Sequence, residues 1–329
     1  MTHKVLITGG MGYLGSRIAN HLAKEHDLEI YLTTHNIQQI LPTWLSKDRL
    51  ISLDITTNNN KELLEACKGI QTIIHLAALN RMDSEANPEK AFIVNSLGTL
   101  KLLQAAEVTG VNRLIYFSTA HIYGASLTDK ITEQTIPHPT NTYAITHKAA
   151  EDFVLAAHNK KTLCGIVLRL SNAFGPPVYY KTNQQVLVVN DLCKQAVINK
   201  KIVLESSGQQ RRDFITIEDT ARAVVHFLHL PPSKCDNGLF NLGGENSLRI
   251  IDLAELISVR CQEVLTFKPE IIKQNTNQDE DFCTFNYCID KLNSTGFRLK
   301  KNHEKEIDDT LRFYLNLSKN KTTNTIFIE

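Results

Sequence analysis

Three glycines, Gly9, Gly12 and Gly15, follow the first apolar run of the chain at a spacing of three residues. Small residues between a strand and a helix let backbone N–H groups and the helix N-terminus approach a diphosphate closely. An ordinary tight turn has a similar composition, but a glycine triplet placed between a strand and a helix favours dinucleotide binding. We therefore predict that this turn, with Tyr13 and Leu14, binds a dinucleotide cofactor.

The end of the second apolar run bears on which dinucleotide is bound. In a dinucleotide-binding fold this strand usually ends in an acidic residue that accepts hydrogen bonds from the adenosine ribose of NAD. Here Thr33, Thr34 and His35 stand instead, and no carboxylate would repel a 2′-phosphate. This favours NADP over NAD, although no Arg is present to bind the phosphate bidentately. The alternative interpretation of His35 is an exposed loop residue.

The first half of the chain alternates short β-branched runs with longer helical patterns. Such a rhythm predicts an α/β fold, a parallel sheet covered by helices. Several strand runs are apolar throughout, as expected of strands buried on both faces, so we predict a Rossmann-type, doubly wound sheet. The strands are expected at 4–8, 29–33, 50–53, 72–77, 113–118 and 164–169, and the helices at 13–26, 88–109 and 143–159.

After about residue 170 the pattern loosens into shorter, separated elements. We expect a dinucleotide-binding domain over 1–170 and a smaller α/β substrate-binding lobe over 171–318, some of which returns to the sheet. The lobe should contain helices near 186–200, 218–230, 250–263 and 305–317 and a strand at 214–217. The polar residues 319–329 are expected to form a tail.

Composition excludes several classes of protein. The chain has 329 residues, and its 36 Lys and Arg against 35 Asp and Glu leave a formal charge of +1, which gives no indication of a nucleic-acid partner. No apolar run is long enough for a signal peptide or a membrane span. Seven scattered cysteines without a CxxC pair suggest neither a disulfide framework nor a zinc site. We expect a reduced, soluble, cytoplasmic protein.

The histidines outside the turn give no metal site. His75 lies in an apolar run and is expected to be a buried core residue. His226 and His229 are three residues apart on a predicted helix, but no third ligand is evident. We predict no metal.

Nine motifs in order resemble the extended short-chain dehydrogenase/reductases, in particular the NAD(P)-dependent nucleotide-sugar epimerases, dehydratases and reductases. The resemblance runs nearly end to end. The motifs are TGGMGYLG at 8–15, LDIT at 53–56, HLAA at 75–78, NSLGT at 95–99, STAHIYG at 118–124, Tyr143, RLSNAFGP at 169–176, RDF at 212–214 and NLG at 241–243.

The resemblance assigns roles to individual residues. It implies that Thr119 and Tyr143 are catalytic, with Tyr143 giving or taking the hydroxyl proton during hydride transfer, and that Asn172 and Arg212 hold the diphosphate of a nucleotide sugar. Asn80 and His121 are also expected at the substrate, and the alternative interpretation of His121 is a surface histidine in a turn. The remaining cofactor contacts implied are Asp54, Ile55, Leu76, Ala77, Ala78, Asn95 and Ser118.

One catalytic position departs from the family pattern, Tyr-x-x-x-Lys. Here His147 stands four residues after Tyr143, and Lys148 follows it. Residues four apart differ by about 40° around a helix axis, whereas residues five apart differ by about 140°. We therefore expect His147 to replace the lysine at the cofactor and Lys148 to point away, although a local shift of the helix would bring Lys148 in.

A second departure narrows the reaction. Sugar 4,6-dehydratases of the family carry Thr-Asp-Glu where this chain has Thr119, Ala120 and His121, so the acid and base for water elimination are missing. We expect hydride transfer at a sugar carbon, C4 in particular, and favour reduction of a 4-keto sugar by NADPH. An NAD-dependent 4-epimerase is the alternative, and a non-catalytic dinucleotide sensor is a second one.

The resemblance also implies a homodimer. Similar proteins pair through the two helices that correspond to 88–109 and 143–159. Leu97, Leu100, Ala149 and Phe153 supply apolar residues for such a contact, unless they face the sheet instead.

Overall fold

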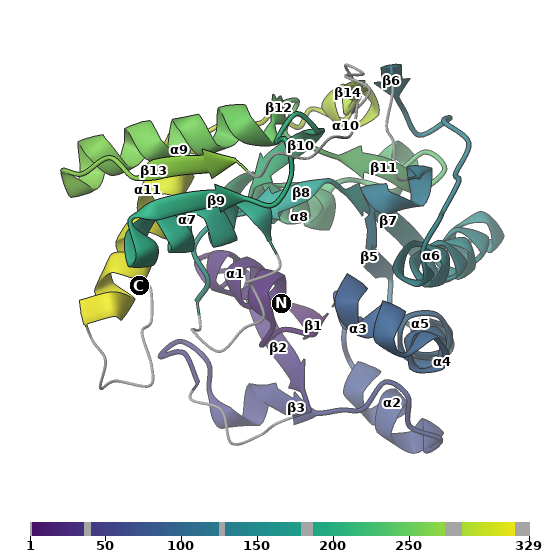
Figure 1. The fold of residues 1–329 in the computed structure, drawn as a ribbon. Helices are drawn as coiled ribbons and strands as arrows, with labels where there is room; N and C mark the ends of the chain where they lie inside the picture. The colour runs from purple at the N-terminus through teal and green to yellow at the C-terminus, as the bar shows by residue number, and fades with distance from the viewer. Residues whose placement is uncertain (1, 36–40, 125–128, 179–186, 274–284, 320–329) are drawn as a thin grey trace.

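Seven parallel strands form the centre of the molecule (Figure 1). The structure, a computed structural model, describes residues 2–35, 41–124, 129–178, 187–273 and 285–319. Every neighbouring pair of strands in this sheet is parallel, which confirms the predicted α/β, doubly wound fold. The strands lie in the order β11 (Leu239–Leu242), β7 (Cys164–Leu170), β5 (Arg113–Thr119), β4 (Thr72–His75), β1 (His3–Thr8), β2 (Leu28–Thr34) and β3 (Leu50–Ser52).

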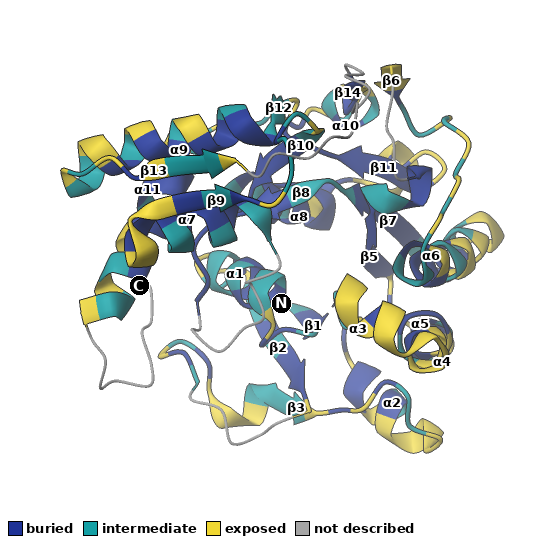
Figure 2. Ribbon diagram, in the orientation of Figure 1, coloured by how far each residue is buried: buried dark blue, intermediate teal, exposed yellow. Residues whose placement is uncertain are grey.

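Helices cover both faces of this sheet. One face packs against α1 (Tyr13–Leu22) and α8 (Ile217–His229), whose apolar side chains share a core with β1 and β5. The other packs against α2 (Asn60–Cys67), α5 (Thr99–Thr109) and α6 (Thr142–Lys160). The strands are therefore buried on both sides, and the exposed residues gather on the outer helices (Figure 2).

The helix predicted at 88–109 is present but not uniform. It runs through α4 (Pro88–Ala91), a π-helical stretch η2 (Phe92–Gly98) and then α5. Within the π stretch, Asn95 and Ser96 turn toward α6, where Asn95 donates to the Thr146 hydroxyl at 3.0 Å and Ser96 donates to the Thr146 carbonyl at 2.8 Å. Such local widening is common at functional sites, and here it joins two helices beside the carboxyl ends of the strands.

The second half of the chain builds a smaller lobe and also returns to the main sheet. The lobe core lies among α7 (Val188–Asn199), α9 (Ile250–Leu265) and α11 (His303–Lys319). Its strands are β8 (Asn172–Phe174), β10 (Arg211–Thr216) and β12 (Ser247–Arg249) in one sheet and β9 (Lys201–Leu204) with β13 (Glu270–Lys273) in another. Because α8 packs on the large sheet and β11 is one of its strands, the chain crosses between the two parts more than once.

Short elements complete the described chain. They are η1 (Lys47–Arg49), α3 (Arg81–Ala86), η3 (Ala120–Tyr123), β6 (Asp129–Ile131), η4 (Pro232–Lys234), β14 (Phe285–Tyr287) and α10 (Asp290–Ser294). Of the predicted tail, Lys319 ends α11 and 320–329 lie outside the described residues, as does Val186 of the helix expected at 186–200. None of the described helices is both long and apolar enough to span a membrane.

Candidate active site

A cavity of about 2340 Å³ lies where the carboxyl ends of the sheet strands meet the smaller lobe. Ligands of open α/β sheets bind at this edge. The cavity wall brings together nearly all of the predicted site residues, from both halves of the chain. They are Gly9, Gly12, Tyr13, Leu14, Gly15, His35, Asp54, Ile55, Leu76, Ala77, Ala78, Asn80, Ser118, Thr119, His121, Tyr143, His147, Asn172 and Arg212.

Asn95 is the exception. It is buried but does not line the cavity, and its amide is used within the protein. Its Oδ1 accepts from the backbone N–H of Leu79 at 2.8 Å, and its Nδ2 donates to Thr146. Asn95 thus holds the loop after β4 against α6 rather than presenting its own side chain to a ligand.

The glycine turn fits a diphosphate. Gly9 adopts a positive φ of 67°, and a Cβ on Gly15 would lie 2.2 Å from the carbonyl oxygen of Gly9, so the turn can be this tight only without side chains. Gly12 is the N-cap of α1 and offers no side chain to cap the first amides. The free N–H groups at the start of α1 therefore lie at the cavity wall, where an anion would satisfy them.

At the other end of the predicted cofactor site, β2 ends in Thr33 and Thr34, and His35 follows the strand. Thr33 and Thr34 are buried and His35 is exposed, and all three line the cavity. Asp54 follows β3, and its Oδ1 accepts from the Thr56 hydroxyl at 2.7 Å and from its N–H at 2.8 Å. These hydrogen bonds lower the pKa of Asp54, with a smaller effect from nearby His35.

Tyr143 and Thr119 meet in the cavity, as the predicted catalytic pair requires. Tyr143 is the second residue of α6, and Thr119 ends β5, so the neighbouring elements bring residues 24 positions apart to one part of the cavity wall. Burial raises the pKa of Tyr143, and the nearby Thr119 hydroxyl opposes this shift only in part. Tyr143 is therefore a protonated phenol at neutral pH.

His147 lies one helical turn after Tyr143, with the two ring centroids 4.4 Å apart. The imidazole is only 3% exposed. Its Nδ1 is 2.7 Å from the Tyr116 hydroxyl, while its Nε2 is buried without a hydrogen-bond partner among the described residues. Burial lowers the pKa of His147 to about 3, and His75 and His121 add to this shift, so the ring is neutral at pH 7.

Lys148 does not replace His147. Its ammonium forms ion pairs with Asp152 and, at 3.9 Å, with Glu151, and it does not line the cavity. The helix is therefore in the register that the sequence predicts, with His147 facing the cavity. Whereas the lysine pattern would place an ammonium beside the tyrosine, this chain places a neutral donor there.

A buried polar network supports the floor of the site. Ser118 donates to the Glu151 carboxylate at 3.0 Å, and the Arg169 guanidinium contacts the same carboxylate, with its Nε at 3.1 Å from Oε2. Arg169 also donates to the Tyr123 hydroxyl at 2.8 Å. Because every charge in this network is paired, it fixes the end of β5 against α6, about two helical turns after Tyr143.

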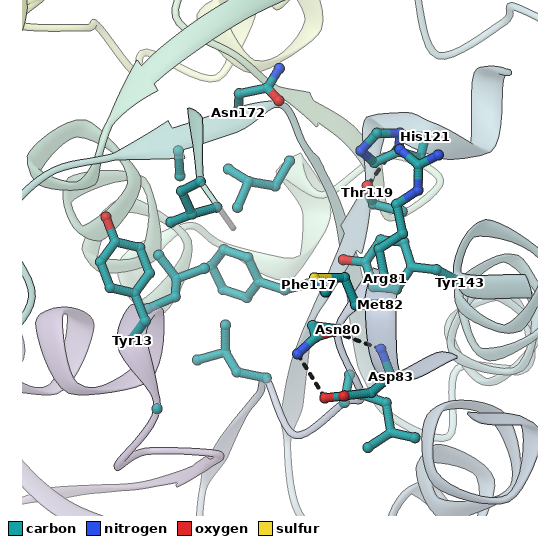
Figure 3. Close-up of a pocket in the computed structure, with 18 of the residues that line it drawn as sticks. Tyr13, Asn80, Arg81, Met82, Asp83, Phe117, Thr119, His121, Tyr143 and Asn172 are labelled. Atoms are coloured by element: carbon teal, nitrogen blue, oxygen red, sulfur yellow. Dashed lines mark hydrogen bonds between the residues drawn. The ribbon is translucent and has the colours of Figure 1, made fainter. Parts of the chain in front are cut away.

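The residues predicted to bind the substrate line the cavity beside β8, β10 and α3. Figure 3 shows Asn172 across the cavity from Asn80 and Arg81. The Asn172 amide donates to the backbone carbonyl of Asp213 at 2.9 Å, which orients Asn172 next to Arg212. Asn80 caps α3, since its Oδ1 accepts from the Asp83 N–H at 2.9 Å and its Nδ2 donates to the Asp83 carboxylate at 2.7 Å. Asn80 therefore lines the cavity with its amide already engaged.

Two residues of the site escaped the sequence analysis. Tyr116 points its hydroxyl at His147 from inside a fully buried strand, and Arg81 reaches the cavity from the first position of α3. Neither belongs to a recognisable motif. The alternation of β5 places Tyr116 and Ser118 on the same face, and this was the one available signal for Tyr116.

The other histidines have structural surroundings. His75 is fully buried, with Nδ1 2.5 Å from the Thr8 hydroxyl and Nε2 2.9 Å from the Thr99 hydroxyl, as expected of a core histidine. The His226 Nε2 lies 2.7 Å from the Thr295 hydroxyl. Across the described ranges, no three His, Cys, Asp or Glu side chains converge in a way that would hold a metal ion.

Comparison with known proteins finds one matching family and several related enzymes. The family model described as "NAD dependent epimerase/dehydratase family" matches residues 5–243. The dTDP-D-glucose 4,6-dehydratase of Mus musculus is 27% identical over 94% of this chain and 88% of its own. The dTDP-glucose 4,6-dehydratase of Escherichia coli is 25% identical over 95% of this chain and 94% of its own.

Solved structures share the fold. The UDP-N-acetylglucosamine 4-epimerase of Methanobrevibacter ruminantium M1, in complex with UDP-N-acetylmuramic acid, aligns with a TM-score of 0.80 at 24% identity, over 96% of this chain and 100% of its own. RMD of Pseudomonas aeruginosa, complexed with NADPH, aligns with a TM-score of 0.77 at 21% identity, over the same shares of the two chains.

Proposed function

The chain belongs to the NAD dependent epimerase/dehydratase family, and we propose that within it the protein reduces a 4-keto nucleotide sugar with NADPH. Proteins of this family act on nucleotide sugars by moving a hydride at a sugar carbon. The direction of that transfer decides between a reductase and an epimerase. An oxidation needs a base at Tyr143, whereas a reduction needs an acid.

The state of Tyr143 carries the proposal. Burial raises the pKa of its hydroxyl, and the residue one turn further along the helix is a neutral imidazole instead of an ammonium. A phenolate at this position would be a buried charge without a cation beside it, which is costly. Tyr143 is therefore suited to give a proton and poorly suited to take one.

In the proposed reaction, the carbonyl carbon accepts a hydride while its oxygen accepts the proton of Tyr143, so that a C=O group becomes CH–OH. A reduced nicotinamide bound along the glycine turn supplies the hydride. The Thr119 hydroxyl, which lies close enough to Tyr143 to influence its pKa, holds the reacting oxygen in line with the phenol. Tyr143 regains its proton from solvent once the product leaves.

The choice of cofactor follows from the end of β2. A 2′-phosphate beside Thr33, Thr34 and His35 would meet hydroxyl and imidazole donors and no carboxylate at that end of the strand. This observation supports NADPH as the reductant. The unpartnered Nε2 of His147 is a suitable donor to a ribose hydroxyl at the nicotinamide end, which NADPH and NADH share.

Dehydration is disfavoured by the residues after Thr119. Ala120 has no ionisable group, and His121 is a neutral imidazole because burial lowers its pKa to about 4. Elimination of water from a 4-keto sugar needs one group to remove a proton and another to protonate the leaving hydroxyl. This pair of positions lacks the carboxyl groups for that step.

The test incubates the purified protein with NADPH and with 4-keto-6-deoxyhexoses linked to UDP or dTDP, and follows absorbance and product stereochemistry. We expect one NADPH consumed per ketone reduced, at a rate that stays level from about pH 6 to 9 because Tyr143 keeps its proton over this range. Interconversion of UDP-glucose and UDP-galactose without net loss of reductant would instead make the protein an epimerase.

A further inference from the structure

Two arginines approach each other in the cavity without an acidic partner. Arg81 comes from α3 and Arg212 from β10, and both line the wall. Among the described residues, neither side chain forms an ion pair or a hydrogen bond. Burial lowers the pKa of Arg212, and the charge of Arg81 lowers it further, so the two guanidinium groups are close enough to repel each other.

Arg81 lies at the reacting end of the cavity. Figure 3 shows its side chain extending toward His121 and Thr119, alongside Tyr143. Burial lowers the pKa of His121, and the charges of Arg212 and Arg81 lower it further. No carboxylate contributes to the pKa shift of His121 or of Arg212. This corner of the cavity is therefore positive and uncompensated.

The acidic residues of α3 are used elsewhere. Asp83 accepts from the Asn80 amide and so belongs to the helix cap. Glu85 accepts from the backbone N–H of Thr142 at 2.8 Å and so belongs to the start of α6. Among the described residues, neither carboxylate forms an ion pair or a hydrogen bond with Arg81.

Arg212 is partly buried and Arg81 is exposed, and a bound anion would relieve the repulsion between their like charges. The proposed nucleotide sugar brings a diphosphate, but Asn172 and Arg212 stand where that group is expected. We propose that Arg81 and His121 bind a second anionic group, a carboxylate carried by the sugar near the reacting carbon. The preferred substrates are then nucleotide sugars with an acidic sugar. This inference rests on the proposed nucleotide-sugar chemistry, but not on its direction.

Binding measurements test the inference without turnover. With the protein saturated with NADP⁺, calorimetry compares UDP-glucuronic acid with UDP-glucose, and UDP-N-acetylmuramic acid with UDP-N-acetylglucosamine, with UDP alone as reference and dTDP-glucose as a check on the base. We expect at least one acidic sugar to bind about tenfold or more tightly than its neutral counterpart, as a charge-assisted bond to Arg provides.

Substitutions show whether the ligand of Arg81 is a sugar carboxylate or the diphosphate. Arg81→Gln should abolish the preference for the acidic sugar and leave the affinity for UDP within about twofold, whereas Arg212→Gln should weaken every ligand, UDP included. Lys90→Gln is the matched control, because Lys90 also lines the cavity but does not contribute to the pKa shift of His121 or of Arg212. Arg81 is exposed, so its replacement should leave the melting temperature unchanged.

Two results would overturn the inference. Equal affinities for acidic and neutral sugars would show that no carboxylate is recognised. A loss of UDP affinity in Arg81→Gln equal to that in Arg212→Gln would assign Arg81 to the diphosphate. Neither result depends on NADPH consumption, so an epimerase with a preference for acidic sugars would refute the proposed reduction and still support this inference.

Discussion

The hydroxyl of Tyr116 lies 2.7 Å from Nδ1 of His147, inside the protein and behind the predicted catalytic tyrosine. Burial raises the pKa of Tyr116 well above its ordinary value, so its hydroxyl keeps its hydrogen. Nδ1 is the one hydrogen-bond partner of this hydroxyl among the described residues, and we infer that the hydroxyl donates to it. The second nitrogen, Nε2, must then carry the N–H of the neutral ring. Because Nε2 has no partner among the described residues, it is the donor left for a ligand in the cavity.

Replacement of Tyr116 by Phe should remove the hydrogen bond that fixes the tautomer of His147. We expect NADPH affinity to fall by roughly three- to tenfold. The hydrogen bond from Tyr116, worth about 1 kcal/mol, would no longer hold Nε2 of His147 in place as a donor to the cofactor. Fluorescence titration measures the affinity, and nitrogen NMR of His147 reports the tautomer in the protein without ligand. Tyr287→Phe is the control, since it removes another buried hydroxyl, 2.8 Å from the Arg169 carbonyl. Equal losses in both variants would assign Tyr116 a structural role only.

Tyr143→Phe should remove the acid. We expect kcat for ketone reduction to fall by about 10² to 10⁴, the usual range for loss of a general acid, with the affinity for NADPH nearly unchanged. Thr119→Val should cost less, because it removes an orienting hydrogen bond and not the proton donor. Steady-state kinetics on both variants provides the measurement, and full activity of Tyr143→Phe would exclude the assigned role.

His147→Lys should restore the charge that this position lacks. An ammonium beside Tyr143 would lower the pKa of the phenol, so oxidation of a sugar alcohol should rise at pH 7 to 8, while ketone reduction stays equal or increases. The rate of each direction is followed against pH with the same substrate and product pair. A large loss in both directions, with the melting temperature unchanged, would show that the imidazole has a chemical role of its own.

His35→Asp should shift the choice of dinucleotide. A carboxylate at the end of β2 repels a 2′-phosphate and accepts hydrogen bonds from ribose hydroxyls, so the ratio of NADPH to NADH affinity should fall by about tenfold or more. Titrations of both cofactors give this ratio. The proposed NADP preference is wrong if the unchanged protein binds NADH more tightly.

The outer surfaces of η2 and α6 support the homodimer as a proposal. Phe92 is 55% exposed and Ile145 is 52% exposed, and Leu97 and Phe153 are also exposed, so these residues do not face the sheet. We expect Phe153→Glu to turn a dimer into a monomer, because a charge would be buried at the helix contact. Sedimentation at micromolar concentration tests this, with Ile136→Glu, on an exposed loop position, as the control. A monomer before any substitution would refute the dimer.

The sequence alone was sufficient for the fold and for most of the cavity wall. The spacing of Gly9, Gly12 and Gly15 after an apolar run predicts the first turn, and the continuous apolar strands predict the parallel sheet, because these signals are local. The spacing also predicted which neighbour of Tyr143 faces the cavity. Four residues make about one full helical turn, so His147 follows Tyr143 and Lys148 does not.

Only the tertiary structure decided the electrostatics of the site. That His147 is neutral depends on its burial and on His75 and His121, which lie on other elements. The acids nearest to Arg81 in the sequence are engaged by Asn80 and by the backbone of Thr142. Charge states and pairings follow from desolvation and from contacts between distant parts of the chain, and neither is a property of a residue or of its immediate neighbours in the sequence. The sequence therefore determined most of the residues that meet at the cavity, with Arg81 missed and Asn95 wrongly included, and the packing around them decided which of those residues are charged.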